Sequence, residues 1–232
     1  MNIVTQPGSL AGEVKINADL LSRFAAIVGE RYAITDPATQ QPYLREMRDL
    51  YRGHTPMVLR PGSVAEVSAI LKLANETKTP IVPQGGNTGL VGGQIPFNGE
   101  IILSLNRLDK IREVDATSNT ITAEAGVSLG RVREAAANVE RLYPLLLPSE
   151  GTCTVGGNLS TNAGGTTAVA WGIARQQALG LEVVLADGRV LNNLNKLKKD
   201  NTGYDLKNLF IGAEGTLGVI TAASLRLIAR PR

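Results

Sequence analysis

The chain has 232 residues, 43% of them hydrophobic and 19% charged, which is typical of a globular protein and argues against global disorder. Its formal net charge is only +3 and its basic residues are scattered, so we expect no nucleic-acid partner. No apolar run reaches the roughly 18 residues that a transmembrane helix needs. The first residues carry Glu13 and Asp19 instead of an apolar core, so no secretory signal is expected.

A single cysteine and a single histidine restrict the chemistry further. Cys153 cannot form an intrachain disulfide and is compatible with a reducing compartment, so we expect a cytoplasmic protein. His54 and Cys153 lie far apart and cannot supply three or four ligands, so no metal site is expected. Nothing around His54 resembles a nucleophile elbow, which argues against a Ser-His-Asp triad.

The first half of the sequence predicts a small βαβ unit. Apolar spacing predicts a helix over 17–29, with Asn17 as its N-cap and Gly29 at its end. The capping-box pattern Ser63-x-x-Glu66 opens a second helix. Short apolar runs predict strands over 56–61, 79–83 and 100–105. Strand, helix and strand in this order favour a right-handed crossover.

The second half predicts a larger, mainly antiparallel sheet with helices. Ser128 can cap a helix to about Glu140, Asp187-Gly188 signals a two-residue hairpin, and 205–210 predicts a helical turn. The expected strands are 108–114, 120–125, 179–186, 189–191 and 217–228. The chain is therefore predicted to be α+β, with a small lobe over 1–105 and a larger lobe over 106–232.

The 25 glycines concentrate in three segments, 83–93, 148–165 and 212–221. In the first segment, glycine lets a ligand approach the backbone closely, and successive N–H groups can form an anion-binding nest for phosphates. Asn87 and Thr88 add side-chain donors. The spacing matches neither the Rossmann fingerprint nor the P-loop. A plain glycine-rich turn is the alternative.

The other two segments extend this hypothesis. The second is dense in small residues, hydroxyls and amides, with Glu150 as its one charge, so it can lie flat against a planar ligand. The third can close the remote end of a ligand through backbone groups where a strand begins. For either segment alone, a loop with tight turns is the alternative.

The order of the three segments resembles the FAD-binding (PCMH-type) domain of the vanillyl-alcohol oxidase and p-cresol methylhydroxylase superfamily. The likeness is greatest to its D-2-hydroxyglutarate and D-lactate dehydrogenase branch, and it runs from about Arg31 to Ile228. The segments that carry it are Pro83-Gln-Gly-Gly-Asn-Thr-Gly-Leu-Val-Gly-Gly93, Gly156-Gly-Asn158, Thr161-Asn-Ala-Gly-Gly165, Leu179-Gly-Leu-Glu-Val-Val-Leu-Ala-Asp-Gly188 and Lys199-Asp-Asn-Thr-Gly-Tyr-Asp-Leu206.

The resemblance implies an FAD site made of three groups of residues, and it identifies no catalytic residue. The FAD pyrophosphate would be held by Pro83, Gln84, Gly85, Gly86, Asn87, Thr88, Gly89, Leu90, Gly92 and Gly93. The flavin and ribityl chain would be lined by Pro148, Ser149, Thr152, Gly156, Gly157, Asn158, Thr161, Asn162, Ala163 and Gly165. The adenosine end would be held by Glu214, Gly218, Val219 and Ile220.

Some features depart from the family pattern. Many members of the superfamily attach FAD through a histidine, but none lies in the three segments, so noncovalent FAD is expected. His54 is expected to be a packing or surface residue. Where the family has an aromatic-Gly-Asn-x-Arg-acid pattern, this chain has Trp171-Gly-Ile-Ala-Arg-Gln176. Trp171 is either a core aromatic or a contact of the flavin region.

The implied activity is oxidation of a D-2-hydroxy acid to the 2-oxo acid by hydride transfer to FAD, followed by electron transfer to an acceptor. The family's C-terminal substrate domain carries its metal-binding histidines. We expect this domain to be missing from residues 1–232, so such a domain or subunit is an expected partner. The main alternative is a non-catalytic flavin-binding or electron-transfer module. A nucleotide-sugar reductase of the same superfamily fits the 200–205 stretch less well.

Overall fold

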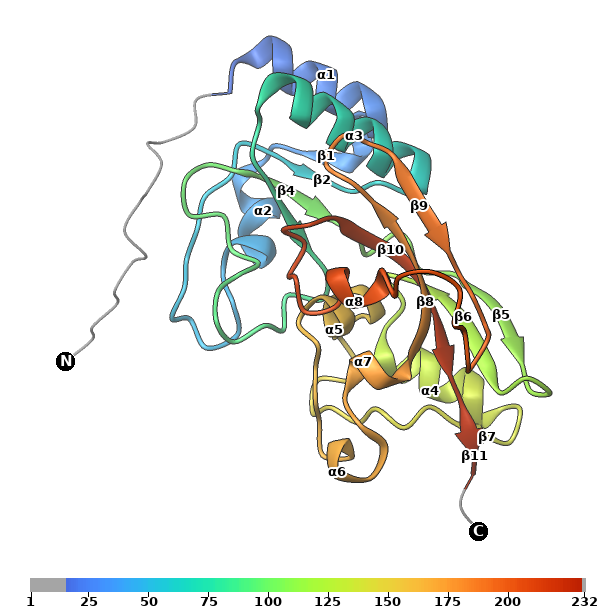
Figure 1. The fold of residues 1–232 in the computed structure, drawn as a ribbon. Coiled ribbons are helices and arrows are strands. Elements are labelled where there is room, and N and C mark those ends of the chain that lie inside the picture. Colours follow the sequence, from blue (N-terminus) through green and yellow to red (C-terminus); the bar gives the residue numbers. More distant parts are fainter. Residues whose placement is uncertain (1–15, 231–232) are drawn as a thin grey trace.

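This computed structural model describes residues 16–230, which form two main β-sheets, each covered by helices on one face (Figure 1). Most of the stretch on which the signal-peptide expectation rests lies outside these residues. The helices are α1 (Ala18–Val28), α2 (Pro37–Leu44), α3 (Val64–Thr77), α4 (Leu129–Ala137), α5 (Val155–Ser160), α6 (Ala168–Trp171), α7 (Ala174–Gln177) and α8 (Lys207–Phe210), with a 3₁₀ turn, η1 (Glu30–Tyr32).

The first sheet has the strand order β1-β2-β4-β3. Its strands β2, β4 and β3 are parallel, and β1 joins the edge in antiparallel orientation. The predicted βαβ unit is therefore present, but β4 is inserted between the two strands that α3 connects. The strands are β1 (Ala33–Ile34), β2 (Val58–Leu59), β3 (Ile81–Gln84) and β4 (Ile101–Ser104).

Helices α1 and α3 cover one face of this sheet, side by side (Figure 1). Both begin at the predicted caps, because Asn17 Oδ1 accepts from Leu20 N at 2.8 Å and Ser63 Oγ accepts from Glu66 N at 3.2 Å. The Glu66 carboxylate accepts from Gly62 N instead of returning to Ser63, so only half of the capping box forms.

The second sheet is antiparallel throughout, in the order β5-β6-β10-β8-β9. Helices α4, α5, α7 and α8 contribute buried side chains to the core on one of its faces. A two-stranded ribbon, β7 with β11, lies beside it. The strands are β5 (Ile111–Asp115), β6 (Thr120–Glu124), β7 (Arg141–Leu142), β8 (Ala178–Val184), β9 (Val190–Asn193), β10 (Val219–Arg226) and β11 (Ile228–Ala229). The α+β prediction is confirmed.

The hairpin between β8 and β9 differs from the two-residue turn expected at Asp187-Gly188. Leu185 N donates to Arg189 O at 2.8 Å, so the loop has three residues, and Gly188 closes it with a φ of +85°. A type I turn followed by a left-handed glycine is the usual three-residue hairpin. Ser68 Oγ on α3 donates to Gly188 O, so this hairpin also packs against the helices of the first sheet.

The two sheets share a hydrophobic core. Phe24, Ile70 and Leu103 pack in one buried cluster with Val184 of β8 and Val219 of β10. Val184 and Val219 come from the second half of the chain, and their side chains are 0% and 4% exposed. Burial of such side chains stabilises each half by contact with the other, which fixes the cleft between the sheets.

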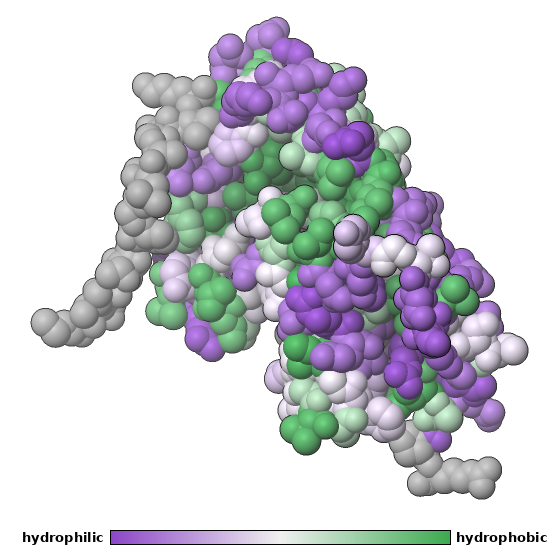
Figure 2. All heavy atoms as spheres, in the orientation of Figure 1, coloured by the Kyte–Doolittle hydropathy of each residue, from purple (hydrophilic) through white to green (hydrophobic). Residues whose placement is uncertain are grey.

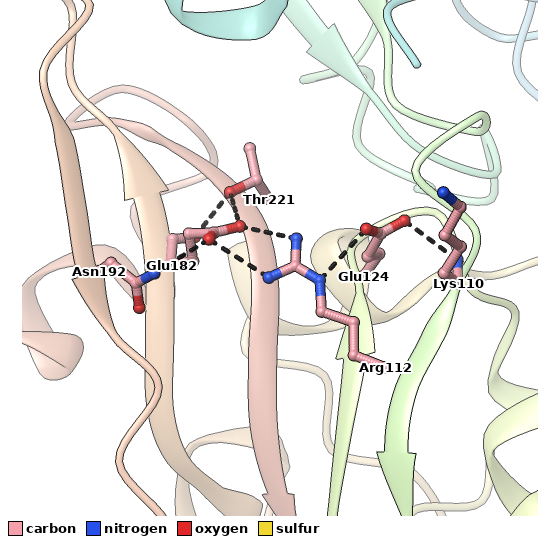
Figure 3. A network of polar contacts seen from close by, with 6 residues as sticks. All are labelled: Lys110, Arg112, Glu124, Glu182, Asn192 and Thr221. Carbon is pink, nitrogen blue, oxygen red and sulfur yellow. Dashed lines mark hydrogen bonds and ion pairs between the residues drawn. The ribbon is translucent and has the colours of Figure 1, made fainter. Parts of the chain in front are cut away.

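A polar network crosses the other face of the second sheet (Figure 3). Arg112 on β5 donates from Nη2 to Glu182 Oε1 on β8 at 2.9 Å, and from Nε to Glu124 Oε1 on β6 at 3.2 Å. Burial alone would lower the pKa of the Arg112 guanidinium, but the hydrogen bonds and charges of Glu182 and Glu124 outweigh it and raise this pKa. The carboxylates also accept from Lys110 N, Thr221 Oγ1 and Asn192 Nδ2.

Removing Arg112 should leave two nearly buried carboxylates without their cation. We expect Arg112→Met to lower the free energy of unfolding by about 2–4 kcal/mol, and an added Glu182→Gln to recover part of it. The measurement is urea unfolding followed by circular dichroism. Arg189→Met, which breaks an exposed pair with Asp187, is the control and should cost at most about 1 kcal/mol. An equal loss in both variants would contradict the role of the network.

Candidate functional site

The three glycine-rich segments meet in the structure, and the first packs against the second through backbone. The Cβ of any side chain at Gly85 would lie 2.4 Å from Thr154 Oγ1, and one at Gly86 would lie 1.9 Å from the carbonyl oxygen of Thr152. Neither distance is possible for a real Cβ, so both positions need glycine. The loop after β3 and the turn before α5 are therefore in direct backbone contact.

The third segment closes on the other two. A Cβ at Gly93 would lie 2.7 Å from Glu214 Oε2, and one at Gly215 would lie 2.9 Å from Pro83 Cγ. Glu214 N donates to Ser160 O at 2.9 Å, at the end of α5. Segments that are far apart in the sequence thus form one continuous surface.

The loop after β3 presents a row of free backbone donors. No acceptor in residues 16–230 bonds to the backbone N–H groups from Gly85 to Gln94, since the β3–β4 ladder ends at Gln84 and Ser104. The residues of this loop are mostly half-buried or exposed. Backbone N–H groups in folded proteins almost always find a partner, so this row fits an anionic ligand such as a diphosphate.

Side-chain amides hold this loop in shape. Asn87 Nδ2 donates to Pro42 O at 2.9 Å and to Arg45 O at 2.8 Å, so its two N–H groups are already used. Gln84 Nε2 donates to Tyr43 O and Gln94 O. The expectation that Asn87 supplies side-chain donors to a ligand is therefore wrong, because these donors bind the loop to the end of α2. The donors that the loop still offers are its backbone N–H groups and the hydroxyl of Thr88.

Two residues that the sequence reasoning missed support this loop. Gln94 Nε2 donates to Asn87 Oδ1 and Gly89 O. Glu46 is 1% exposed and accepts from Arg48 N and Leu50 N, both at 2.6 Å, next to the Arg45 carbonyl that Asn87 binds. Desolvation raises the pKa of the Glu46 carboxyl, but the backbone hydrogen bonds outweigh it and lower this pKa overall. Neither residue stands in a glycine-rich segment, so composition gave no signal for them.

The second segment contains α5, which is capped by Thr154 Oγ1 through Gly157 N. Gly156 packs on Ala125, where a Cβ would lie 2.7 Å from the Ala125 Cβ. Asn158 is 6% exposed and donates to Cys153 Sγ at 3.6 Å, so its side chain faces the protein. Several expected flavin-lining residues have exposed or half-buried positions: Pro148, Ser149, Thr152, Gly157, Thr161, Asn162, Ala163 and Gly165.

The turn before α5 is bound to α4. Gly130 N donates to Glu150 O at 2.7 Å, and Leu129 N donates to Cys153 O at 3.0 Å. Arg133 Nη1 pairs with the Glu150 carboxylate. The one charge of this segment is thus an anchor that holds the turn in place.

The third segment presents backbone to the cleft. The side chains of Val219 and Ile220 are 4% and 2% exposed and belong to the two cores, so only their backbone can reach a ligand. Pairing of β10 with β6 begins at Ala222, which leaves the backbone edge at Val219 and Ile220 without a β6 partner. What this segment can offer a ligand at the start of β10 is therefore backbone.

A cavity of about 330 Å³ lies between the β3 edge and this segment. A volume of this size can hold one ring system of a ligand. Figure 2 shows apolar surface in the hollow below the hydrophilic top of the molecule, where α1 and α3 lie. The cavity lining includes Leu71, Ile81, Pro83, Gly215, Gly218 and Val219.

Trp171 and His54 lie outside these contacts. Trp171 on α6 is 43% exposed, so it is not a core aromatic. His54 is exposed, and its backbone N–H donates to Pro96 O at 2.9 Å. Among residues 16–230, no group of three His, Cys, Asp or Glu side chains comes together as a metal site, and no helix is long and apolar enough to cross a membrane.

The backbone contact at Gly86 makes a specific prediction. Gly86→Ala should force the loop away from Thr152, because the backbone there cannot move easily. We expect the free energy of unfolding to fall by about 1–3 kcal/mol and the melting temperature to fall by several degrees. Gly89→Ala is the matched control, because its Cβ would meet the flexible end of Gln94 at 2.7 Å. Thermal unfolding by circular dichroism measures both. A Gly89 variant at least as unstable as the Gly86 variant would contradict the contact.

Known proteins resemble this chain along most of its length. A D-2-hydroxyglutarate–pyruvate transhydrogenase of Saccharomyces cerevisiae is 41% identical over 219 residues, 94% of this chain and 44% of that protein. A D-2-hydroxyglutarate dehydrogenase of Danio rerio is 44% identical, over 94% of this chain and 41% of that protein. The chain thus spans less than half of the length of either relative.

A solved structure shares the fold. The structure of p-cresol methylhydroxylase with substrate bound superimposes with a TM-score of 0.77 at 23% identity, covering 92% of this chain and 43% of that chain. This likeness confirms the predicted PCMH-type architecture, a βαβ sheet followed by a larger antiparallel sheet.

The comparisons correct one expectation. The relatives from Danio rerio, Bos taurus and Rattus norvegicus are described as mitochondrial, so the expected cytoplasmic location is wrong. A lone cysteine is compatible with a reducing environment and does not distinguish one such compartment from another.

A protein-family model that matches more than half of the sequence shows the family. The FAD binding domain matches residues 55–193, from β2 to the end of β9. This match includes the first two glycine-rich segments, and the free N–H row after β3 fits the diphosphate of its cofactor. The chain belongs to the FAD-binding domain family, and its cofactor is FAD.

Proposed function

We propose that this chain is the FAD-binding part of a dehydrogenase that oxidises a D-2-hydroxy acid, such as 2-hydroxyglutarate or lactate, to the 2-oxo acid. The observation that carries the proposal is the 44% identity to a D-2-hydroxyglutarate dehydrogenase over 94% of the chain. Bound FAD supplies the hydride acceptor, and the protein supplies binding and orientation.

Each segment has a separate task in this proposal. The lobe over 1–105 contributes the backbone N–H groups of Gly85 to Gln94, which neutralise and orient the pyrophosphate. The lobe over 106–232 contributes Thr152, Gly157 and Thr161 beside the flavin and ribityl chain. The backbone of Gly218, Val219 and Ile220 holds the adenosine end. The apolar cavity along β3 supports this last assignment, because an adenine ring is planar and poorly hydrated on its faces.

FAD is held without a covalent bond in this proposal. The one imidazole of the sequence is His54, which stands upstream of β2 and outside all three segments. A row of backbone donors with a shaped cavity can retain a dinucleotide by hydrogen bonds and apolar contact. The match covers 41–44% of the relatives' lengths. We propose that the residues that bind the hydroxy acid come from a polypeptide equivalent to the unmatched part of these relatives.

Acid precipitation of the purified chain should release the flavin into the supernatant, because hydrogen bonds and apolar contacts are lost on unfolding. Absorbance of pellet and supernatant at the flavin band measures it. A yellow pellet would contradict noncovalent binding. The released cofactor should be FAD and not FMN.

The activity has its own test. The FAD-loaded chain is mixed with D-2-hydroxyglutarate, D-lactate and their L-enantiomers, and bleaching of the flavin absorbance is followed, with and without an artificial electron acceptor. We expect slow reduction by the chain alone, and faster reduction by a D-enantiomer when the remaining part of a relative is added. Without clamping groups, little of the orientation that lowers the barrier is supplied. Failure of every D-acid with that part present would favour a non-catalytic flavin module.

A further inference from the structure

Arg175 on α7 binds the second glycine-rich segment and the residues just before the third. Its backbone N donates to Asn162 Oδ1 at 3.1 Å, within the second segment. Its Nη1 donates to Asn208 O at 2.9 Å and to Asn208 Oδ1 at 2.8 Å, and its Nη2 donates to Ile211 O at 2.5 Å. One residue thus binds Asn162 on one side and the α8 segment on the other.

The acceptors of this guanidinium are all neutral. No carboxylate in residues 16–230 forms an ion pair with Arg175. Three neutral oxygens around a half-buried cation indicate that its planar fork is used to fix geometry, since a charge pair would use a carboxylate.

The position that Arg175 fixes leads directly into the third segment. Gly212 follows Ile211, has a φ of +83°, and would place a Cβ 3.3 Å from Arg175 Nη2 and 3.5 Å from Asn162 Cβ. Gly212 N and Glu214 N donate to Leu159 O and Ser160 O at the end of α5. The Glu214 side chain then reaches Gly93 of the loop after β3.

We infer that Arg175 is a positioning residue of the FAD site. By holding Asn208 and Ile211 against Asn162, it sets the third segment at the distance from α5 at which both can contact one FAD molecule. It touches neither substrate nor reacting atoms. The inference rests on the proposed assignment of the second and third segments to the two ends of FAD.

The test compares Arg175→Met and Arg175→Lys with Arg141→Met in the full chain. Arg141 is a matched control, because its guanidinium also binds neutral oxygens, Asn119 Oδ1 and Ala116 O, but in the β5–β6 turn away from all three segments. The FAD dissociation constant is measured by quenching of flavin fluorescence, and stability by thermal unfolding without FAD.

We expect both Arg175 variants to raise the dissociation constant about tenfold or more, because an ammonium cannot bridge Asn208 and Ile211 at once. The visible circular dichroism of the bound flavin should change with it. Arg141→Met should lower the melting temperature and leave the dissociation constant and the spectrum unchanged. Wild-type affinity in Arg175→Lys would overturn the inference, since charge alone would then suffice.

Amide hydrogen exchange of the FAD-free chain separates this inference from the proposed function. Arg175→Met should accelerate exchange at Gly212 and Glu214, and Arg141→Met should not. If exchange at these amides is unchanged, the inference is wrong whatever FAD does. If exchange is accelerated but the wild-type chain binds no FAD, Arg175 does hold the third segment in place and the proposed cofactor site is wrong. If it is accelerated and FAD affinity stays the same, Arg175 does not position the site.

Discussion

The constraint on which the rest of this structure depends is the backbone contact between the loop after β3 and the turn before α5. Gly86 leaves no room for a Cβ against the Thr152 carbonyl, and Gly85 leaves none against Thr154. Because the two loops touch, the free N–H row of the first lies beside the exposed hydroxyls and amides of the second. A ligand that spans both segments meets backbone N–H donors at the first and hydroxyl and amide groups at the second.

The shared core makes this contact durable. Val184 and Val219 from the second sheet are buried with Phe24 and Leu103 from the first half of the chain. The Ser68 bond to Gly188 adds a second junction in the loop that follows β8. Since the two sheets cannot separate without exposing these side chains, the cleft is built into the fold and needs no ligand to form.

Much of this architecture could be predicted from local sequence. The caps Asn17 and Ser63 and the strands of the hairpin 111–124 follow from spacing and turn chemistry. The position of β4 between β2 and β3 could not be predicted from local sequence, because strand order depends on contacts between residues far apart in the chain. The three-residue loop at Gly188 was missed because Asp-Gly is compatible with more than one turn.

The site was predictable to the level of segments. Glycine composition located the three stretches, but it did not say which atoms are free. The side-chain amide of Asn87 was assigned to a ligand, but in the structure it donates to the carbonyl oxygens of Pro42 and Arg45. Glu46, Gln94 and Arg175 were missed because their partners, 2 to 36 residues away in the sequence, follow no repeating spacing.

Titration of the FAD-free chain, followed by emission of its one tryptophan, tests the central claim most directly. Trp171 stands at the end of α6, the first helix after the second segment. The account predicts saturable quenching with one equivalent of FAD, and much weaker binding of FMN, which lacks the adenosine end that the third segment holds. Equal affinity for FAD and FMN, or no saturable quenching by FAD, would contradict a site built jointly from the three segments.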